Sequence, residues 1–160
     1  MEIRRAVSDE LAAVGELTVA AYAGFSTGAE DFYVAHLRDA AARDREAELW
    51  VAEDDGSLVG TLTIAPEGSP WRELGGPGEG EFRMLAVAPE ARGRGVGDAL
   101  VRHALDRFRA AGHRRVVLCS LAEMAAAHRI YRRLGFVRAP ELDWSPEDGV
   151  DLIAFAKELP

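Results

Sequence analysis

Residues 81–112, EFRMLAVAPEARGRGVGDALVRHALDRFRAAG, combine three structural signals in a short span. Over 81–87, charged and apolar side chains alternate and then give way to a continuous apolar run, the pattern of a strand that becomes buried. Pro89 follows this run, and over 100–108 apolar residues recur every three or four positions, as on a helix buried along one face. Gly112 is a natural stop for that helix. The stretch therefore predicts a strand, a turn and a helix.

The turn between this strand and helix is suited to bind an anion. It holds three glycines within five residues, Gly93, Gly95 and Gly97, so the backbone can approach a ligand closely. The first amides of the following helix have no partner within the helix and attract negative charge. Arg92 and Arg94 add positive charge. The turn therefore predicts a site for a phosphate or a pyrophosphate.

Two common nucleotide-binding motifs do not fit this turn. A dinucleotide fingerprint needs glycines at its first, third and sixth places, but the sixth place counted from Gly93 is Asp98, whose carboxylate would repel a pyrophosphate. A P-loop ends in Gly-Lys-Ser/Thr, and this turn has no lysine. Another motif must account for the turn.

The motif that fits is Arg-x-x-Gly-x-Gly at 92–97, preceded by Leu-x-Val-x-Pro at 85–89. Together with Leu-Gly-Phe at 134–136, it resembles the GNAT superfamily of acyl-CoA-dependent N-acetyltransferases. In that family the turn wraps the pyrophosphate of coenzyme A. The resemblance therefore implies acetyl-CoA as cosubstrate and a primary amine, on a small molecule or a peptide, as acceptor. It covers 48–138 well and the preceding part of the chain only loosely.

The resemblance also implies a fold, the α/β GNAT fold, with residues 1–160 as a single domain. Its sheet is mixed and mostly antiparallel, with about six to seven strands and about four flanking helices. At its centre, the fourth strand over 81–87 and the fifth strand over 116–119 run parallel, since a right-handed crossover helix joins them. In the family these two strands splay apart, and the pantetheine arm of the cofactor bonds to the main-chain groups left unpaired.

The cofactor-binding residues implied by this resemblance lie on the central strand, in the turn and just after the fifth strand. They are Leu85, Ala86, Val87, Arg92, Gly93, Arg94, Gly95, Val96, Gly97, Ser120 and Met124. Main-chain contacts are expected at Leu85 and Val87. Met124 stands where many relatives have an asparagine, so the hydrogen bond of that asparagine is missing here.

Two residues are the expected catalysts. The resemblance gives Tyr131, four residues before Gly135, the role of general acid toward the departing thiolate of coenzyme A, while its ring packs against Phe136 at the helix end. The general base should be a carboxylate near the start of the central strand. Glu81, acting through water, is the first choice and Glu79 the second. The alternative for Glu81 is a solvated glutamate at a strand end.

The acceptor side is less well defined. The resemblance implies that the helix expected over 30–43 forms one wall of the acceptor site. The loop 65–80, rich in glycine and proline, is either a lid over that site or an ordinary surface excursion. The site's candidate contacts, each of which could instead be an ordinary core residue, are Tyr22, Phe25, Phe32, Tyr33, His36, Trp71, Asp143 and Trp144. A small metabolite, an antibiotic, a lysine and an N-terminal α-amine all remain open as acceptors.

The composition narrows the function classes. The chain has 160 residues, of which 48% are hydrophobic, and a net charge of -8, which argues against nonspecific nucleic-acid binding. Its single cysteine, Cys119, fits a reducing compartment, and no apolar run approaches a membrane span. We therefore expect a cytoplasmic protein with no metal, no nucleic-acid partner and no membrane contact, and a homodimer stays open. A non-catalytic acyl-CoA-binding sensor is the alternative function.

Overall fold

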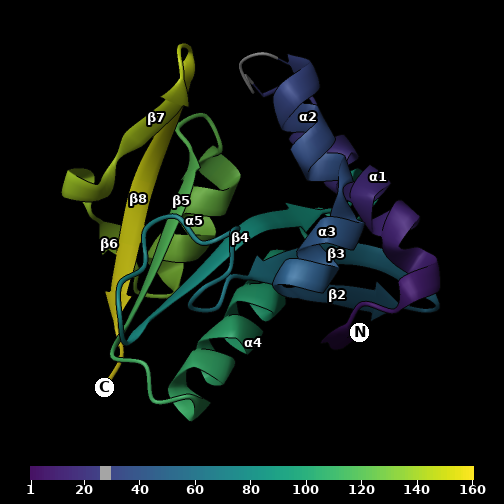
Figure 1. The fold of residues 1–160 in the computed structure, drawn as a ribbon. Helices are drawn as coiled ribbons and strands as arrows, with labels where there is room; N and C mark the ends of the chain where they lie inside the picture. Colours follow the sequence, from purple (N-terminus) through teal and green to yellow (C-terminus); the bar gives the residue numbers. More distant parts are fainter. Residues whose placement is uncertain (26–29) are drawn as a thin grey trace.

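The computed structural model describes the backbone of residues 1–25 and 30–160, and the side chains in these ranges except those of residues 30–32 and 147. One mixed sheet of eight strands has the order β1-β2-β3-β4-β5-β8-β6, with β7 paired to β8 outside this order (Figure 1). The strands are β1 (Glu2–Arg5), β2 (Glu48–Asp54), β3 (Ser57–Ile64), β4 (Glu79–Val87), β5 (Arg115–Leu121), β6 (Val137–Arg138), β7 (Trp144–Glu147) and β8 (Val150–Glu158).

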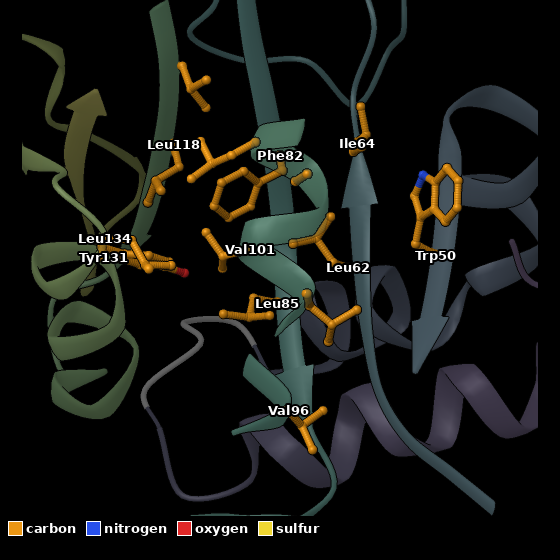
Figure 2. Close-up of a cluster of buried hydrophobic side chains, with 14 of the residues drawn as sticks. Trp50, Leu62, Ile64, Phe82, Leu85, Val96, Val101, Leu118, Tyr131 and Leu134 are labelled. Atoms are coloured by element: carbon orange, nitrogen blue, oxygen red, sulfur yellow. The ribbon is translucent and has the colours of Figure 1, made fainter. Parts of the chain in front are cut away.

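Helices cover both faces of this sheet. They are α1 (Leu11–Tyr22), α2 (Glu30–Arg38), α3 (Ala40–Glu46), α4 (Val96–Ala110) and α5 (Ala125–Arg133). One core cluster joins α4 and α5 to strand residues that include Trp50 and Phe82 (Figure 2). On the other face, Leu49 and Val51 pack with residues of α1 and α3. Successive side chains of β2 thus point to opposite faces, as strand geometry requires.

The central strands β4 and β5 are parallel and separate along their length. Their pairing runs from Glu79 opposite Arg115 to Glu81 opposite Val117 and then stops. Both strands continue beyond that point, β4 to Val87 and β5 to its own end, and they diverge in the ribbon view (Figure 1). The predicted parallel, splayed pair is confirmed, and main-chain groups on the facing edges of the separated parts are left without a strand partner.

A β-bulge lies on β4 where this separation begins. Thr63 of β3 is opposite Arg83, whereas Thr61 is opposite Ala86, so β4 holds one residue more than β3 over this interval. Met84 within the bulge has a φ of 53°, in the left-handed region that non-glycine residues rarely adopt. The bulge turns Leu85 toward the core under α4, while Met84 and Ala86 join the core on the opposite face.

The structure departs from the expected fold in two details. The sheet has eight strands because the C-terminal segment forms the short strands β6 and β7 as well as β8. The helix expected over 30–43 is divided into α2 and α3 at Asp39, whose carboxylate accepts a hydrogen bond of 3.0 Å from the amide of Ala42. Aspartate is favoured at a helix N-cap, so it starts a new helix here and raises the helix number to five among the described residues.

Within the described part of the chain, no helix is both long enough and apolar enough to cross a bilayer.

Candidate active site

A cleft of about 540 Å³ lies between the end of β4, the turn before α4, and α5. Nine of the eleven predicted cofactor-binding residues line it: Leu85, Ala86, Val87, Arg92, Gly93, Gly95, Val96, Gly97 and Met124. Arg94 and Ser120 are the two that do not. The cleft extends from the splayed end of the central strand to the start of a helix, which suits a long ligand with an anionic part.

The glycine-rich turn has the backbone geometry that its sequence predicts. Gly93 and Gly95 have φ values of 79° and 81°, and Gly95 is the N-cap residue of α4. No side chain caps this helix end, so its first amides remain available to an anion. At Gly97 a Cβ would lie 2.7 Å from the Cδ1 of Ile130, so α4 and α5 pack closely here and a side chain would require Ile130 to shift.

The charged side chains around this turn differ in whether they line the cleft or form ion pairs elsewhere. Arg92 lines the cleft and donates a hydrogen bond of 3.3 Å to the carbonyl of Ala21. Arg94 points elsewhere and forms an ion pair of 2.5 Å with Asp54 at the β2–β3 turn. Asp98 lines the cleft but forms an ion pair with Arg133, which offsets its repulsion of an anion. Arg133 and Arg129 also line the cleft and add positive charge to it.

Two smaller cavities continue from the cleft into the molecule. The first inner chamber, of about 10 Å³, is lined by Tyr22, Phe82, Arg83, Met84, Leu85, Leu118, Cys119, Ser120, Met124 and Tyr131. The second inner chamber, of about 20 Å³, is lined by Tyr22, Tyr33, Arg83, Met84, Cys119, Ser120, Leu121 and Leu152. The first chamber shares Leu85 and Met124 with the cleft, and it shares Arg83 with the second chamber. Shared residues therefore link the cleft to the first chamber and the first chamber to the second, and Ser120 lines both chambers.

Tyr131 lies on α5 where the cleft meets the first inner chamber. Its ring packs against Phe82, Phe136 and Phe155 at centroid distances of 6.0, 5.9 and 5.6 Å. Its hydroxyl end points away from α5 toward the side on which Leu85 lies (Figure 2). Burial raises the pKa of this hydroxyl, so it stays protonated at neutral pH. The ring thus has a packing role, and the hydroxyl is placed beside the chamber.

Glu81 has an environment that differs from the one a general base needs. Its side chain is fully buried, and its carboxylate accepts hydrogen bonds from the amides of Glu73, Leu74 and Gly75 at 3.0, 2.8 and 2.8 Å. It lines neither inner chamber. The loop over 65–78 folds over this strand residue, a contact that no local pattern in the sequence indicates.

Glu79, the second choice for the base, lies at the start of β4, away from the cleft at the other end of the strand. It forms ion pairs with Arg115 at 3.3 Å and Arg114 at 3.6 Å, and it accepts a hydrogen bond of 2.8 Å from the amide of Gly76. Burial alone would raise the pKa of Glu79, but the Gly76 amide and Arg115 outweigh it and lower the pKa. Glu79 is therefore held as a carboxylate and is poorly suited to accept a proton.

The loop brings a different carboxylate, that of Glu73, into contact with two residues that line the inner chambers, although Glu73 itself lines neither. Its Oε1 lies 3.0 Å from the Nε of Arg83 and accepts a hydrogen bond of 3.3 Å from the thiol of Cys119, and both partners line the chambers. Burial raises the pKa of Glu73 despite the opposing charge of Arg83. Sequence analysis missed Glu73, because an isolated acid in a loop has no periodicity to mark it.

The aromatic side chains expected at the acceptor site are only partly brought together. Tyr22 lines both inner chambers, Tyr33 lines the second and Phe25 lines the outer cleft. The side chain of Phe32 is outside the described part of the structure. Trp71 is buried, with its indole N–H donating to Glu46 at 2.9 Å and its ring edge to face with that of His36.

The indole of Trp144 lies beside the thiol of Cys119. Burial raises the pKa of this thiol to about 12. Cys119 is therefore not a thiolate nucleophile at neutral pH. Asp143 lies apart from these chambers in an ion pair of 2.5 Å with Arg138.

Residues 12–136 match the acetyltransferase (GNAT) family, and the chain belongs to it. Among curated relatives, the mycothiol acetyltransferase of Cellulomonas flavigena is 34% identical over 138 residues, which cover 73% of this chain and 38% of that protein. N-acetyltransferase 8 of Rattus norvegicus is 34% identical over 122 residues, covering 73% of this chain and 53% of that protein. The chain thus spans between about a third and a half of the length of these relatives.

Solved structures show the same fold. The Salmonella typhimurium protein yncA, solved with its cofactor acetyl-CoA, superposes with a TM-score of 0.68 at 24% identity, over 100% of this chain and 94% of that chain. The GNAT fold predicted from the turn motif is therefore confirmed, with its parallel β4–β5 pair at the centre of an open mixed sheet.

Proposed function

We propose that this chain is an N-acetyltransferase that moves an acetyl group from acetyl-CoA to a primary amine by direct attack in a ternary complex. The observation that carries the proposal is a cleft that begins at an uncapped helix end, runs along a splayed strand and shares Leu85 and Met124 with a chamber lined by Tyr131 and Arg83. A long anionic thioester and a small amine could meet at that junction. Holding both reactants together supplies much of the rate gain in such a reaction.

The residues of the cleft fit coenzyme A. The uncapped amides at the start of α4, together with Arg92, are placed to bind its pyrophosphate. The main chain of Leu85 and Val87 lies on the separated part of β4, where the amides of a pantetheine arm can complete its hydrogen bonds. An amide of this segment, that of Leu85 in our proposal, would also polarise the thioester carbonyl.

Tyr131 is proposed as the general acid. When the tetrahedral intermediate collapses, the carbon–sulfur bond breaks and the thiolate takes the phenolic proton. The raised pKa of Tyr131 keeps that proton in place until the thiolate forms. The attacking nitrogen, which carries an extra proton after addition, loses that proton to solvent as the amide forms, and solvent returns a proton to the phenolate and takes up the one held by the general base.

We propose Glu73 as the general base in place of Glu81. Glu73 contacts groups that line the inner chambers and has a raised pKa. The carboxylate of Glu81 instead accepts three hydrogen bonds, all from loop amides. Glu73 would take a proton from the acceptor ammonium, and the neutral amine would then attack the thioester. Glu81 would act as a positioning residue, because it holds the loop segment that carries Glu73.

The test is release of free thiol from acetyl-CoA by the purified protein in the presence of a panel of primary amines. We expect amine-dependent thiol release that rises with pH toward about 8 as the amine loses its proton. Tight binding of coenzyme A without turnover on any amine would instead support a non-catalytic sensor.

A further inference from the structure

Arg43 on α3 is a buried cation that lacks an ion-pair partner among the described carboxylates. Its side chain is fully buried, and its Nε has no hydrogen-bond partner. Its guanidinium donates to the carbonyl of His36 at 2.7 Å and lies near the ring of Trp71, 5.9 Å from the ring centroid. Burial lowers its pKa to about 10, so it remains charged at neutral pH. Buried charges are normally paired, so this cation favours an anion nearby.

A second guanidinium, that of Arg83, lies close to the first and faces the inner chambers. Each arginine perturbs the ionisation of the phenol of Tyr22, which lines both chambers, and the charge of Arg83 lowers the pKa of Arg43. Arg83 also donates to the carbonyl of Trp71 at 3.2 Å. Arg83 therefore lines the chambers, and Arg43, which lines neither, adds its positive charge from outside them.

Only one described carboxylate lies within ion-pair distance of these two cations, that of Glu73 beside Arg83. The other nearby acids have hydrogen bonds elsewhere. Asp39 caps α3, Glu46 accepts from the indole of Trp71, and Glu81 accepts from three loop amides. Among these charged groups only Arg83 lines the inner chambers, so the charge that faces the chambers is positive.

We infer that the amine acceptor carries a carboxylate beside its amine, as an α-amino acid does, and that Arg83 binds that carboxylate. This inference rests on the proposed function. Glu73 Oε1 and Arg83 Nε are 3.0 Å apart, so the site offers a negative and a positive group side by side. The ammonium and carboxylate of an α-amino acid are separated by one carbon and match that pair, with the ammonium toward Glu73 and the carboxylate toward Arg83.

Arg83 is well suited to this role. A guanidinium presents several donors in one plane and binds a carboxylate through two of them, which fixes orientation as well as adding affinity. The charge of Arg43 behind Tyr22 strengthens the attraction. A site built around a charged group discriminates strongly against an analogue that lacks the matching group, because its own buried charge is then left unpaired.

The experiment compares α-amino acids with the amines that remain when their carboxylates are removed, in the thiol-release assay. Values of kcat/KM are expressed per neutral amine, so that the different amine pKa values do not bias the comparison. The inference predicts that kcat/KM is at least about tenfold higher for the amino acid of a pair. In Arg83→Gln this ratio should fall to about one, whereas Arg83→Lys should keep part of it. The control Arg114→Gln removes an exposed arginine far from the chambers and should leave the ratio unchanged.

The ratio separates acceptor recognition from any general loss of activity in Arg83→Gln, because a damaged site lowers both members of a pair. Equal or better turnover of the decarboxylated amines, or an unchanged preference in Arg83→Gln, would overturn the inference while leaving acetyl transfer intact. Absence of thiol release with every amine would instead overturn the proposed function.

Discussion

The carboxylate of Glu81 accepts a hydrogen bond of 3.0 Å from the backbone amide of Glu73. A buried acid on the central strand therefore fixes the position of a second acid in the loop above it, and the next two amides of that loop reinforce the contact. The acid that contacts the chamber-lining residues Arg83 and Cys119 is the one on the loop. This division of roles between two glutamates yields tests that separate the base from the residue that positions it.

Glu73→Gln should lower kcat/KM about 10²-fold or more, the usual contribution of a general base. Burial raises the pKa of Glu73, so in the parent protein activity should fall as the pH drops through that pKa and the carboxylate gains a proton. In the variant this loss of activity at low pH, the acid limb of the pH profile, should disappear, and only the titration of the amine should remain. Glu67→Gln is the matched control, since Glu67 accepts a hydrogen bond from the amide of Gly78 in the same loop, whereas Glu73 contacts the chamber-lining Arg83 and Cys119.

Glu81→Gln should reduce the free energy of unfolding by about 2 kcal/mol, since the new amide group cannot accept all three loop N–H bonds in the interior. Urea denaturation measures this loss. The kcat/KM of Glu81→Gln should fall as well, but the acid limb of its pH profile should persist, because Glu73 is still present. An acid limb that is lost in Glu81→Gln and kept in Glu73→Gln would return the role of base to Glu81, as the sequence alone predicts.

Gly95→Ala should weaken coenzyme A binding and cost about 1 kcal/mol of stability, because Gly95 has a φ of 81° that alanine adopts with strain. Gly68→Ala provides the comparison. Gly68 has a similar φ of 86°, and a Cβ at either glycine would contact nothing within 4 Å. Both variants should lose similar stability, but only Gly95→Ala should raise the Kd for coenzyme A. If both variants bound coenzyme A with the same Kd, the cofactor would have to bind away from the turn.

Tyr131→Phe should lower kcat about 10²-fold with little change in coenzyme A affinity, since it removes the phenolic proton and keeps the ring. The ring contacts with Phe82, Phe136 and Phe155 should preserve the melting temperature. Thiol release and calorimetry on the same preparation measure the two quantities. A kcat equal to that of the parent would exclude Tyr131 as the acid.

Local features of this protein could be predicted from the sequence, because neighbouring residues decide them. The turn at Gly93 and Gly95, the helix after it and the stop at Gly135, with a φ of 95°, follow from glycine's freedom and from apolar spacing. The parallel central pair follows from the crossover rule. The division of the expected helix into α2 and α3 at Asp39 could also have been predicted, since aspartate is a common N-cap residue.

The acceptor side could not be predicted in the same way, because it is built by contacts between segments without periodic patterns. Nothing near Glu73 in sequence indicates that its amide would bond to Glu81, or that its carboxylate would meet Arg83 and Cys119. Arg83 could have been recognised, since strand alternation places it on the same face as Glu81. A cytoplasmic location, a single-domain protein and a homodimer remain predictions.

The central claim is that the cleft along β4 and α4 binds acetyl-CoA, and isothermal titration calorimetry of the unmodified protein with acetyl-CoA tests it most directly. The account predicts saturable binding of one molecule per chain, weakened by Gly95→Ala and unchanged by Gly68→Ala. A titration without binding heat, confirmed by the absence of any shift in melting temperature at saturating acetyl-CoA, would contradict it.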